Sequence, residues 1–295
     1  MFMSIKQVRF FFLSFAVMLL AACAVPLSPD GQAPGTVSDP ATATAEDPNA
    51  AILSAAEDAG ILVYTVQEQQ SDQRYQLNLL IPVTDNEAID ARLGAMADEF
   101  ITEYHNTAQE VAADYRKYRE ETGETAATFH ADYMQSFRIA RADEALLAFV
   151  VEQYRNTGNT GSDDVTGYTF DRSTGEELTL TDFFVDDSYL ARLSDLTRAQ
   201  LIQRYTNETG DMSFDSDAAK QEYLDNMQSM VEAGTTPEAK NFDGLVFQAD
   251  NSVLIVFDKY QVAPGAWGNP EITVPLDAIQ DLLTPRMSDL LGLDG

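Results

Sequence analysis

Short segments rich in branched and aromatic residues, separated by polar residues, mark the first half of the ordered part of this chain. Two of them, residues 61–66 and 75–81, predict strands that a polar turn joins into a hairpin. Residues 127–140 and 145–154 have the same composition and predict two further strands.

Between these two pairs of strands, the apolar period changes to that of a helix. From residue 87 to about residue 121, apolar residues recur at helical spacing, namely Ile89, Leu93, Met96, Phe100, Ile101 and Tyr104. This spacing puts them on one face of a long helix. A long helix that crosses to a strand meander indicates an α+β fold rather than a regular alternation of strands and helices.

The second half also mixes strands and helices. Residues 167–171 and 177–180 flank a tight turn in which Gly175 can supply a positive φ angle, so they predict a hairpin. Two helices follow, lined by Leu190, Leu193, Leu196, Leu201 and Tyr205 and by Tyr223, Leu224, Met227, Met230 and Val231. The remaining predicted elements are strands at residues 244–248, 252–258 and 271–274 and a short helix at residues 276–283.

These elements predict an α+β fold with antiparallel sheets, in two modules. The N-terminal module, residues 51–160, contains the long helix, and the second module, residues 161–285, contains two helices and a C-terminal meander. Residues 286–295 are interpreted as a tail. With 45% hydrophobic residues, the chain can bury a sizeable core.

The beginning of the chain has the pattern of a secretion signal. Residues 1–22 contain a basic start, with Lys6 and Arg9, and an apolar run. The stretch Leu20-Ala21-Ala22-Cys23 resembles the lipobox of bacterial lipoprotein precursors, in which the leader is cut before the cysteine and the thiol is acylated. A membrane-spanning anchor is the alternative, but the apolar stretch covers 16 residues, whereas spanning takes about 20.

We therefore expect a lipid on Cys23, palmitate for example, that holds the protein on the extracytoplasmic face of the cell membrane or the outer membrane. Residues 23–50 contain several prolines among small and polar residues, with almost no large apolar residue after Leu27. Such a composition is typical of a flexible tether.

Charge narrows the range of partners. The chain has 18 Lys and Arg against 48 Asp and Glu, for a net charge of −30. A surface this acidic repels phosphate backbones and argues against nucleic-acid binding. An acidic surface favours the binding of divalent cations or of a basic partner. An adaptation to solubility in a salty habitat would also explain the excess of acidic residues. We expect a monomer.

Several stretches resemble one known type of envelope domain. They are Tyr168-Thr169-Phe170-Asp171, Thr174-Gly175, residues 178–184, residues 244–247, Phe257-Asp258-Lys259-Tyr260-Gln261-Val262-Ala263-Pro264 and Val274-Pro275-Leu276. This RsiV-like domain is the C-terminal module shared by the extracytoplasmic part of the anti-sigma factor RsiV and by the peptidoglycan deacetylase PdaC. The hairpin, long helix and two strands before it resemble the module that usually precedes it, so the resemblance spans roughly residues 55–285.

The resemblance implies a non-catalytic extracytoplasmic binding module. In the RsiV branch the module binds lysozyme, a basic hydrolase, and in the PdaC branch it accompanies a separate catalytic domain. We expect this chain to carry neither a sigma-binding segment nor a deacetylase domain. Residues 156–164 contain glycines but lack the histidine that many members of the family have there.

Catalytic and metal-binding motifs are sparse. His105 and His130 form no metal-binding motif, the only cysteine belongs to the lipobox, and no serine lies in a Gly-x-Ser-x-Gly stretch, so we predict no cofactor. The abundant carboxylates leave one alternative open, a glycan hydrolase that uses a pair of them.

One acidic stretch has the spacing of a calcium loop. Asp211, Ser213, Asp215, Asp217 and Glu222 occupy the ligand positions, but Ser216 stands where such a loop needs glycine. We favour the simpler interpretation, in which Asp215 or Ser216 caps the following helix.

The leading ligand is therefore a basic lysozyme-like hydrolase or wall glycan. We expect it to contact the loop from Tyr260 to Asn269, which contains the only tryptophan of the chain. Trp267 would be the apolar anchor, and Tyr260 and Gln261 would place it or contact the ligand. The alternative is that Trp267 folds back onto the core.

Overall fold

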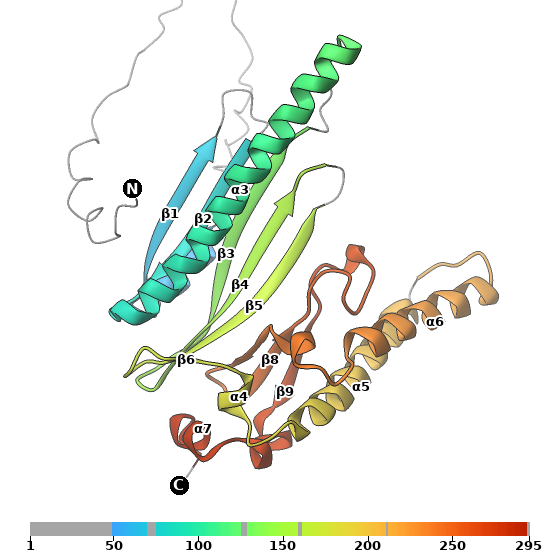
Figure 1. Ribbon diagram of the computed structural model, residues 1–295. Helices are drawn as coiled ribbons and strands as arrows, with labels where there is room; N and C mark the ends of the chain where they lie inside the picture. The colour runs from blue at the N-terminus through green and yellow to red at the C-terminus, as the bar shows by residue number, and fades with distance from the viewer. Residues whose placement is uncertain (1–48, 70–74, 125–128, 159–160, 211, 294–295) are drawn as a thin grey trace, which may run out of the picture. The chain divides into compact units, whose positions relative to one another are not determined.

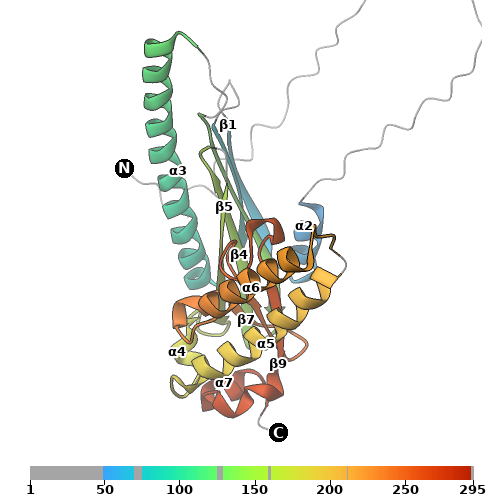
Figure 2. The same cartoon turned by 90° about the vertical axis from the view of Figure 1, so that its right-hand side faces the viewer.

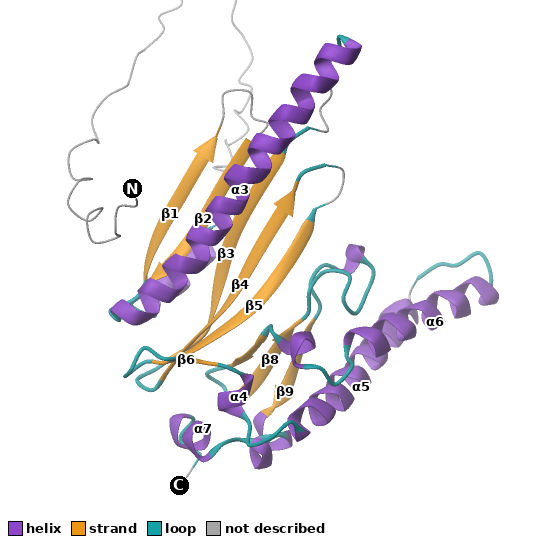
Figure 3. Cartoon of the chain, viewed as in Figure 1, coloured by secondary structure: helices purple, strands orange, loops and turns teal. Residues whose placement is uncertain are grey.

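The computed structural model describes residues 49–69, 75–124, 129–158, 161–210 and 212–293. The predicted leader, Cys23 and almost all of the predicted tether lie outside these residues. Strands and helices alternate irregularly along the described chain (Figure 3), and the predicted α+β class is confirmed. Within the described residues, no helix combines the length and the apolar character needed to cross a membrane.

A six-stranded sheet occupies the first half of the fold and extends into the second (Figure 1), with the strand order β1-β2-β3-β4-β5-β6. Its strands and associated helices are α2 (Ala50–Asp58), β1 (Leu62–Gln69), β2 (Tyr75–Val83), α3 (Glu87–Thr122), β3 (Ala131–Ala142), β4 (Leu146–Asn156), β5 (Ser162–Asp171) and β6 (Glu177–Leu178).

A three-stranded sheet, with the order β7-β8-β9, and the remaining helices complete the fold. These elements are α4 (Leu180–Phe183), α5 (Ser188–Gly210), α6 (Asp217–Gly234), β7 (Leu245–Phe247), β8 (Ser252–Val256), β9 (Glu271–Pro275) and α7 (Pro285–Leu290). Four short 3-10 turns, η1 (Ala239–Phe242), η2 (Gly265–Trp267), η3 (Leu276–Ala278) and η4 (Gln280–Leu282), lie among them.

The pairing of the strands confirms the two predicted hairpins. β1 runs antiparallel to β2, and β5 runs antiparallel to β6 across a turn in which Gly175 has φ 76°. The pairing of β2 with β3 is parallel, however, whereas we had predicted antiparallel sheets. The reason is that α3 carries the chain back along the sheet between these strands, and such a crossover connects parallel neighbours.

The helix α3 is determined by local sequence signals at both ends. The side chain of Asn86 accepts hydrogen bonds from the backbone N–H groups of Ala88 and Ile89, at 2.9 and 3.4 Å, and caps the first turn. Gly123, with φ 72°, ends the helix in the left-handed conformation. The predicted apolar face is confirmed, because all its members except the half-buried Ile101 are buried.

The two faces of the six-stranded sheet have different partners. Because successive side chains of a strand point to opposite faces, Phe149 and Val151 of β4 join the cluster that contains α3 residues, while Ala148 and Val150 join a cluster with Val246 of β7. Figure 2 shows α3 on one side of this sheet and α2 on the other, with α5 and α6 crossing the lower part of the view. The boundary that we predicted between residues 160 and 161 lies between β4 and β5, which pair along their length.

The end of the chain differs from the prediction. Residues 276–283 form two 3-10 turns instead of one helix, and a separate helix, α7, begins with Pro285 after the cap Thr284. Proline is well tolerated in the first turn of a helix but not in its interior, so it starts a new helix here. Met287 and Leu291 are buried, and the segment that we interpreted as a tail thus contributes to the core.

Candidate functional site

The three residues that we predicted to bind a ligand lie on the connection between β8 and β9. We call residues 260–269 the Trp267 loop. Its three candidate side chains have different surroundings: Tyr260 is 50% exposed, whereas Gln261 and Trp267 are partly buried. The three side chains therefore have different roles in the Trp267 loop.

Trp267 packs against the two long helices of the second half. Its ring centroid lies 4.8 Å from that of Tyr205 on α5, with the ring planes 63° apart. Its indole Nε1–H donates a hydrogen bond to the hydroxyl of Tyr223 on α6, at 3.1 Å. These are the contacts of a side chain folded onto the core, the alternative that the sequence left open. Direct contact between Trp267 and a ligand stays a prediction.

Gln261 fixes the loop to its surroundings. Its Oε1 accepts a hydrogen bond from the backbone N–H of Asp258, at 3.0 Å. Its Nε2 donates to the carbonyl of Gly234, at the end of α6, and to that of Asn241, at 3.0 and 3.1 Å. The amide therefore has three internal partners, and we interpret Gln261 as a residue that positions the loop.

Tyr260 is the exposed member of the three. Its φ angle of 71° lies in the left-handed region, where a non-glycine residue costs about 1 kcal/mol or more. Its ring covers Gly265 so closely that a Cβ at this position would collide with the ring. The Lys259 ammonium lies 5.8 Å from the ring centroid and 3.4 Å from a carboxylate oxygen of Asp163 on β5. The exposed ring is thus held in a defined position.

Carboxylates gather around Asp258, two residues before Tyr260. Burial raises the pKa of Asp258, and the nearby charges of Asp164, Asp243 and Asp163 raise it further. One oxygen of Asp258 accepts a hydrogen bond from the backbone N–H of Val165, at 2.6 Å, and thereby links the second sheet region to β5. Across the described residues, no group of three or more metal-binding side chains is arranged to hold an ion.

The other residues that the sequence singled out have structural partners. Ser216 caps α6, because its hydroxyl accepts from the backbone N–H of Ala219 at 3.1 Å, and this favoured interpretation is confirmed. Asp211 lies outside the described residues. The Nε2 atom of His105 lies 2.9 Å from a carboxylate oxygen of Glu68, and the Nε2 atom of His130 lies 3.7 Å from a carboxylate oxygen of Asp132. Each histidine therefore faces a different carboxylate.

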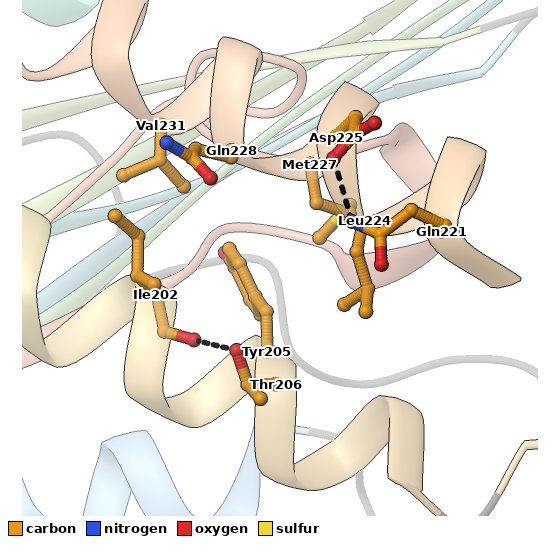
Figure 4. A pocket seen from close by; sticks show the side chains of 9 residues that line it. All are labelled: Ile202, Tyr205, Thr206, Gln221, Leu224, Asp225, Met227, Gln228 and Val231. Atoms are coloured by element: carbon orange, nitrogen blue, oxygen red, sulfur yellow. Dashed lines mark hydrogen bonds between the residues drawn. The ribbon is translucent and has the colours of Figure 1, made fainter.

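A pocket of about 160 Å³ opens between α5 and α6. Its apolar lining consists of Ile202, Tyr205, Leu224, Met227 and Val231. Its polar lining consists of Thr206, Gln221, Asp225 and Gln228. Figure 4 shows the Tyr205 ring rising from α5 into the space between the two helices. Because Trp267 contacts this ring, the Trp267 loop packs against one of the residues that line the pocket.

Tyr205 carries a hydroxyl that has no hydrogen-bond partner. The residue is 2% exposed, and its oxygen is one of three unpartnered buried side-chain oxygens among the described residues, with those of Thr169 and Thr209. Burial raises the pKa of Tyr205 to about 12, so the hydroxyl is a neutral donor at neutral pH. Periodicity had identified Tyr205 only as part of the buried helix face, since no sequence signal reveals a missing partner.

Several known proteins are similar to this chain. Residues 181–277 match the model of DUF3298, a protein family of unknown function. The chain is 23% identical to the peptidoglycan-N-acetylmuramic acid deacetylase PdaC of Bacillus subtilis (strain 168) over 210 residues, which is 70% of this chain and 39% of that protein. The chain thus spans about two fifths of the length of this curated relative.

Two crystal structures of DUF3298 family proteins are also similar to it. The one from Bacteroides fragilis NCTC 9343 has a TM-score of 0.56 and 17% identity, and covers 78% of this chain and 94% of its own. The one from Pseudomonas aeruginosa PAO1 has a TM-score of 0.49 and 14% identity, and the match covers 77% of this chain and 94% of that structure's chain. At this identity the first likeness concerns the fold alone. The α+β fold and the similarity to a PdaC-type domain are thereby confirmed.

Proposed function

We propose that this protein is a non-catalytic binding domain of the cell envelope, held at the membrane by a lipid on Cys23, and that it binds a basic wall-degrading hydrolase of the lysozyme type. The similarity to a peptidoglycan deacetylase supports a location at the cell wall. The observation that carries the choice of partner is the net charge of −30.

The described ion pairs leave this excess of negative charge unbalanced. Single arginines often contact two carboxylates: Arg286 contacts Asp171 and Glu176, and Arg155 contacts Glu103 and Asp164. Each of these two arginines already has two carboxylate partners, and the acidic residues of the chain far outnumber its basic residues. A basic protein would therefore be attracted over a long range, and its association rate would depend on salt.

Specificity requires shape in addition to charge. Tyr260 offers an exposed aromatic ring on a loop that Gln261 and Gly265 hold in place, and fixed aromatic side chains are common centres of binding energy. The ring lies next to the paired Lys259 and Asp163. We assign the central contact to Tyr260 and a supporting role to Trp267 on the same loop.

The experiment measures the binding of hen lysozyme to the chain from residue 24 onward at several salt concentrations, with cytochrome c as an equally basic control protein. We expect lysozyme to bind more tightly than the control, and to associate faster at low salt. Tyr260→Ala should raise the dissociation rate about tenfold or more. Tyr64→Ala is the matched control variant, because Tyr64 on β1 is also 50% exposed.

Equal binding of lysozyme and cytochrome c would overturn the proposed partner. Incubation of the same protein with purified cell wall tests the alternative function. Release of soluble glycan fragments would identify a hydrolase that uses paired carboxylates, and binding without release would support the binding domain.

A further inference from the structure

We propose that the free edge of β1 binds a second copy of this chain: two β1 strands pair antiparallel and join two six-stranded sheets into one. The inference does not depend on the proposed protein partner, and it departs from the monomer that we expected from the sequence. It follows from the unpaired edge of β1, from the side chains along this strand and from their lack of charge.

The backbone of β1 is available for pairing. β1 is the outermost strand of the six-stranded sheet (Figure 1), and among the described residues it pairs with β2 alone. Every second residue of an outermost strand directs its N–H and C=O groups away from the sheet, where another strand can bind them. All eight residues of β1 pair with β2 in one continuous register. The free edge is therefore regular and has no bulge that would prevent pairing.

β1 also carries two exposed apolar side chains. Leu62 is 70% exposed and Tyr64 is 50% exposed. Alternation places both on one face of the sheet with Val66 and Glu68. This is the face that α3 covers, because Val66 packs against a cluster that contains α3 residues and Glu68 lies 2.9 Å from His105 of α3. An apolar strip thus runs along the free edge, beside α3.

The lack of charge along this strip is what selects the partner. Edge strands usually avoid pairing with their own copies through charged side chains, prolines or bulges. Residues 62–67 contain neither a charged residue nor a proline, although 22% of the residues of the chain are charged. A basic strand would meet no carboxylate along these residues. The β1 strand of a second copy is uncharged in the same way and has the same apolar strip.

The predicted tether is a poorer occupant of this edge. Residues 23–50 contain five prolines, and proline lacks the N–H group that strand pairing needs. The second copy therefore fits the edge better than this segment of the same chain does.

One antiparallel register matches the two apolar strips. With Tyr64 opposite Tyr64 of the second copy, Leu62 lies opposite Val66, and Glu68 lies opposite Gly60, which precedes the strand. Side chains directly opposite each other are about 5 Å apart, so the apolar groups make contact. A shift by two residues would instead place Glu68 opposite Leu62. The first register also has the two-fold symmetry of a closed dimer.

The net charge opposes the association at long range. Each chain carries −30, so two copies repel each other until salt screens their charges. Salt should therefore strengthen the dimer, whereas it should weaken the proposed contact with lysozyme. At low salt the chain should be mainly monomeric, and Tyr64→Ala remains a neutral control for lysozyme binding under that condition.

The test measures the mass of the chain from residue 24 onward by sedimentation equilibrium over a range of protein concentrations. We expect a monomer–dimer equilibrium whose dissociation constant falls about tenfold or more between about 0.05 M and about 0.5 M salt. Hydrogen exchange of the β1 amides should slow as the protein concentration rises, because the second copy protects the N–H groups that point away from β2.

Paired charge variants test the register. Tyr64→Glu and Tyr64→Lys should each weaken the dimer about tenfold, because like charges then lie directly opposite each other. An equimolar mixture of the two variants should restore the dimer, since opposite charges then face each other. Both variants should keep the wild-type fold, because Tyr64 is half exposed. Val185→Glu is the matched control and should dimerise like the wild type, since Val185 is 64% exposed and lies outside β1.

A chain that stays monomeric at high salt would overturn the proposed dimer, and this is also the result expected if β1 instead accepts a strand of another protein. Tyr64 variants that dimerise as well as the wild type, or a mixture that associates no better than its two components, would overturn it too. If the dimer forms but lysozyme binds no better than cytochrome c, the proposed protein partner alone fails.

Discussion

The indole N–H of Trp267 donates to the hydroxyl of Tyr223, 3.1 Å away, and this bond connects the loop between β8 and β9 to α6. The same indole packs against Tyr205 of α5. One side chain thereby couples the Trp267 loop to both helices of the pocket. The loop and the pocket are consequently expected to lose their structure together when this side chain is removed.

Substitutions of Trp267 test this coupling. Trp267→Ala should lower the free energy of unfolding by about 3 kcal/mol, because a large half-buried ring is lost. Trp267→Phe should cost less, about 1 to 2 kcal/mol, since it keeps an aromatic contact but loses the hydrogen bond. Urea denaturation followed by circular dichroism measures both values. An unchanged stability of Trp267→Ala would instead support an exposed anchor.

The lowered pKa of the Asp171 carboxylate predicts that its contribution to the stability of the fold is lost at acid pH. Although burial desolvates it, hydrogen bonds from Ser173 and Arg286 lower its pKa from 3.8 to about 2. The stabilisation is therefore complete above the unfolded pKa and is lost as the pH falls through the folded pKa. Asp171→Asn should cost about 1 to 2 kcal/mol at pH 7, since water screens the partly exposed Arg286.

This difference between the wild type and Asp171→Asn should shrink towards zero near pH 2. Denaturant titrations of both proteins at pH 7, 4 and 2 measure it. A difference that stays constant over this range would show that the amide disturbs packing rather than the charge.

Asp258 predicts the opposite dependence. Burial, with a further contribution from nearby carboxylates, raises its pKa, so the ionised form destabilises the fold at neutral pH. This cost is relieved as the pH falls below the raised pKa. Asp258→Asn keeps an oxygen for the N–H of Val165 and removes the charge, so it should raise the melting temperature at pH 7 and have little effect at pH 3.

Asp258→Ala is the informative companion variant, because it removes the charge and the hydrogen bond to Val165 together. It should be less stable than Asp258→Asn at both pH values. If both variants were equally stable, the bond to Val165 would contribute nothing.

The proposed anchor gives a prediction that is independent of the fold. Cys23→Ser should abolish both acylation and cleavage of the leader at this site, because the thiol is the acceptor of the lipid. Metabolic labelling with a fatty-acid probe, read together with the mass of the product, checks this. Labelling of the variant at the level of the wild type would disprove the lipid site.

Elements with local signals could be predicted from the sequence. The helix α3 has an apolar face at regular spacing, Asn86 before it and Gly123 after it, and all these signals lie within or beside the helix. The hairpin of β5 and β6 likewise depends on a short turn with Gly175. Interactions within a few residues determine such elements, so the sequence alone is sufficient to identify them.

Long-range contacts decided the rest. The parallel pairing of β2 with β3 depends on where α3 leads the chain. The inward orientation of Trp267 depends on Tyr205 and Tyr223, which lie 62 and 44 positions away in the sequence. The sequence determined that Tyr205 is buried, because burial follows from apolar periodicity. Only the tertiary structure decided that its hydroxyl has no partner, because a hydrogen bond depends on the positions of groups that folding brings together.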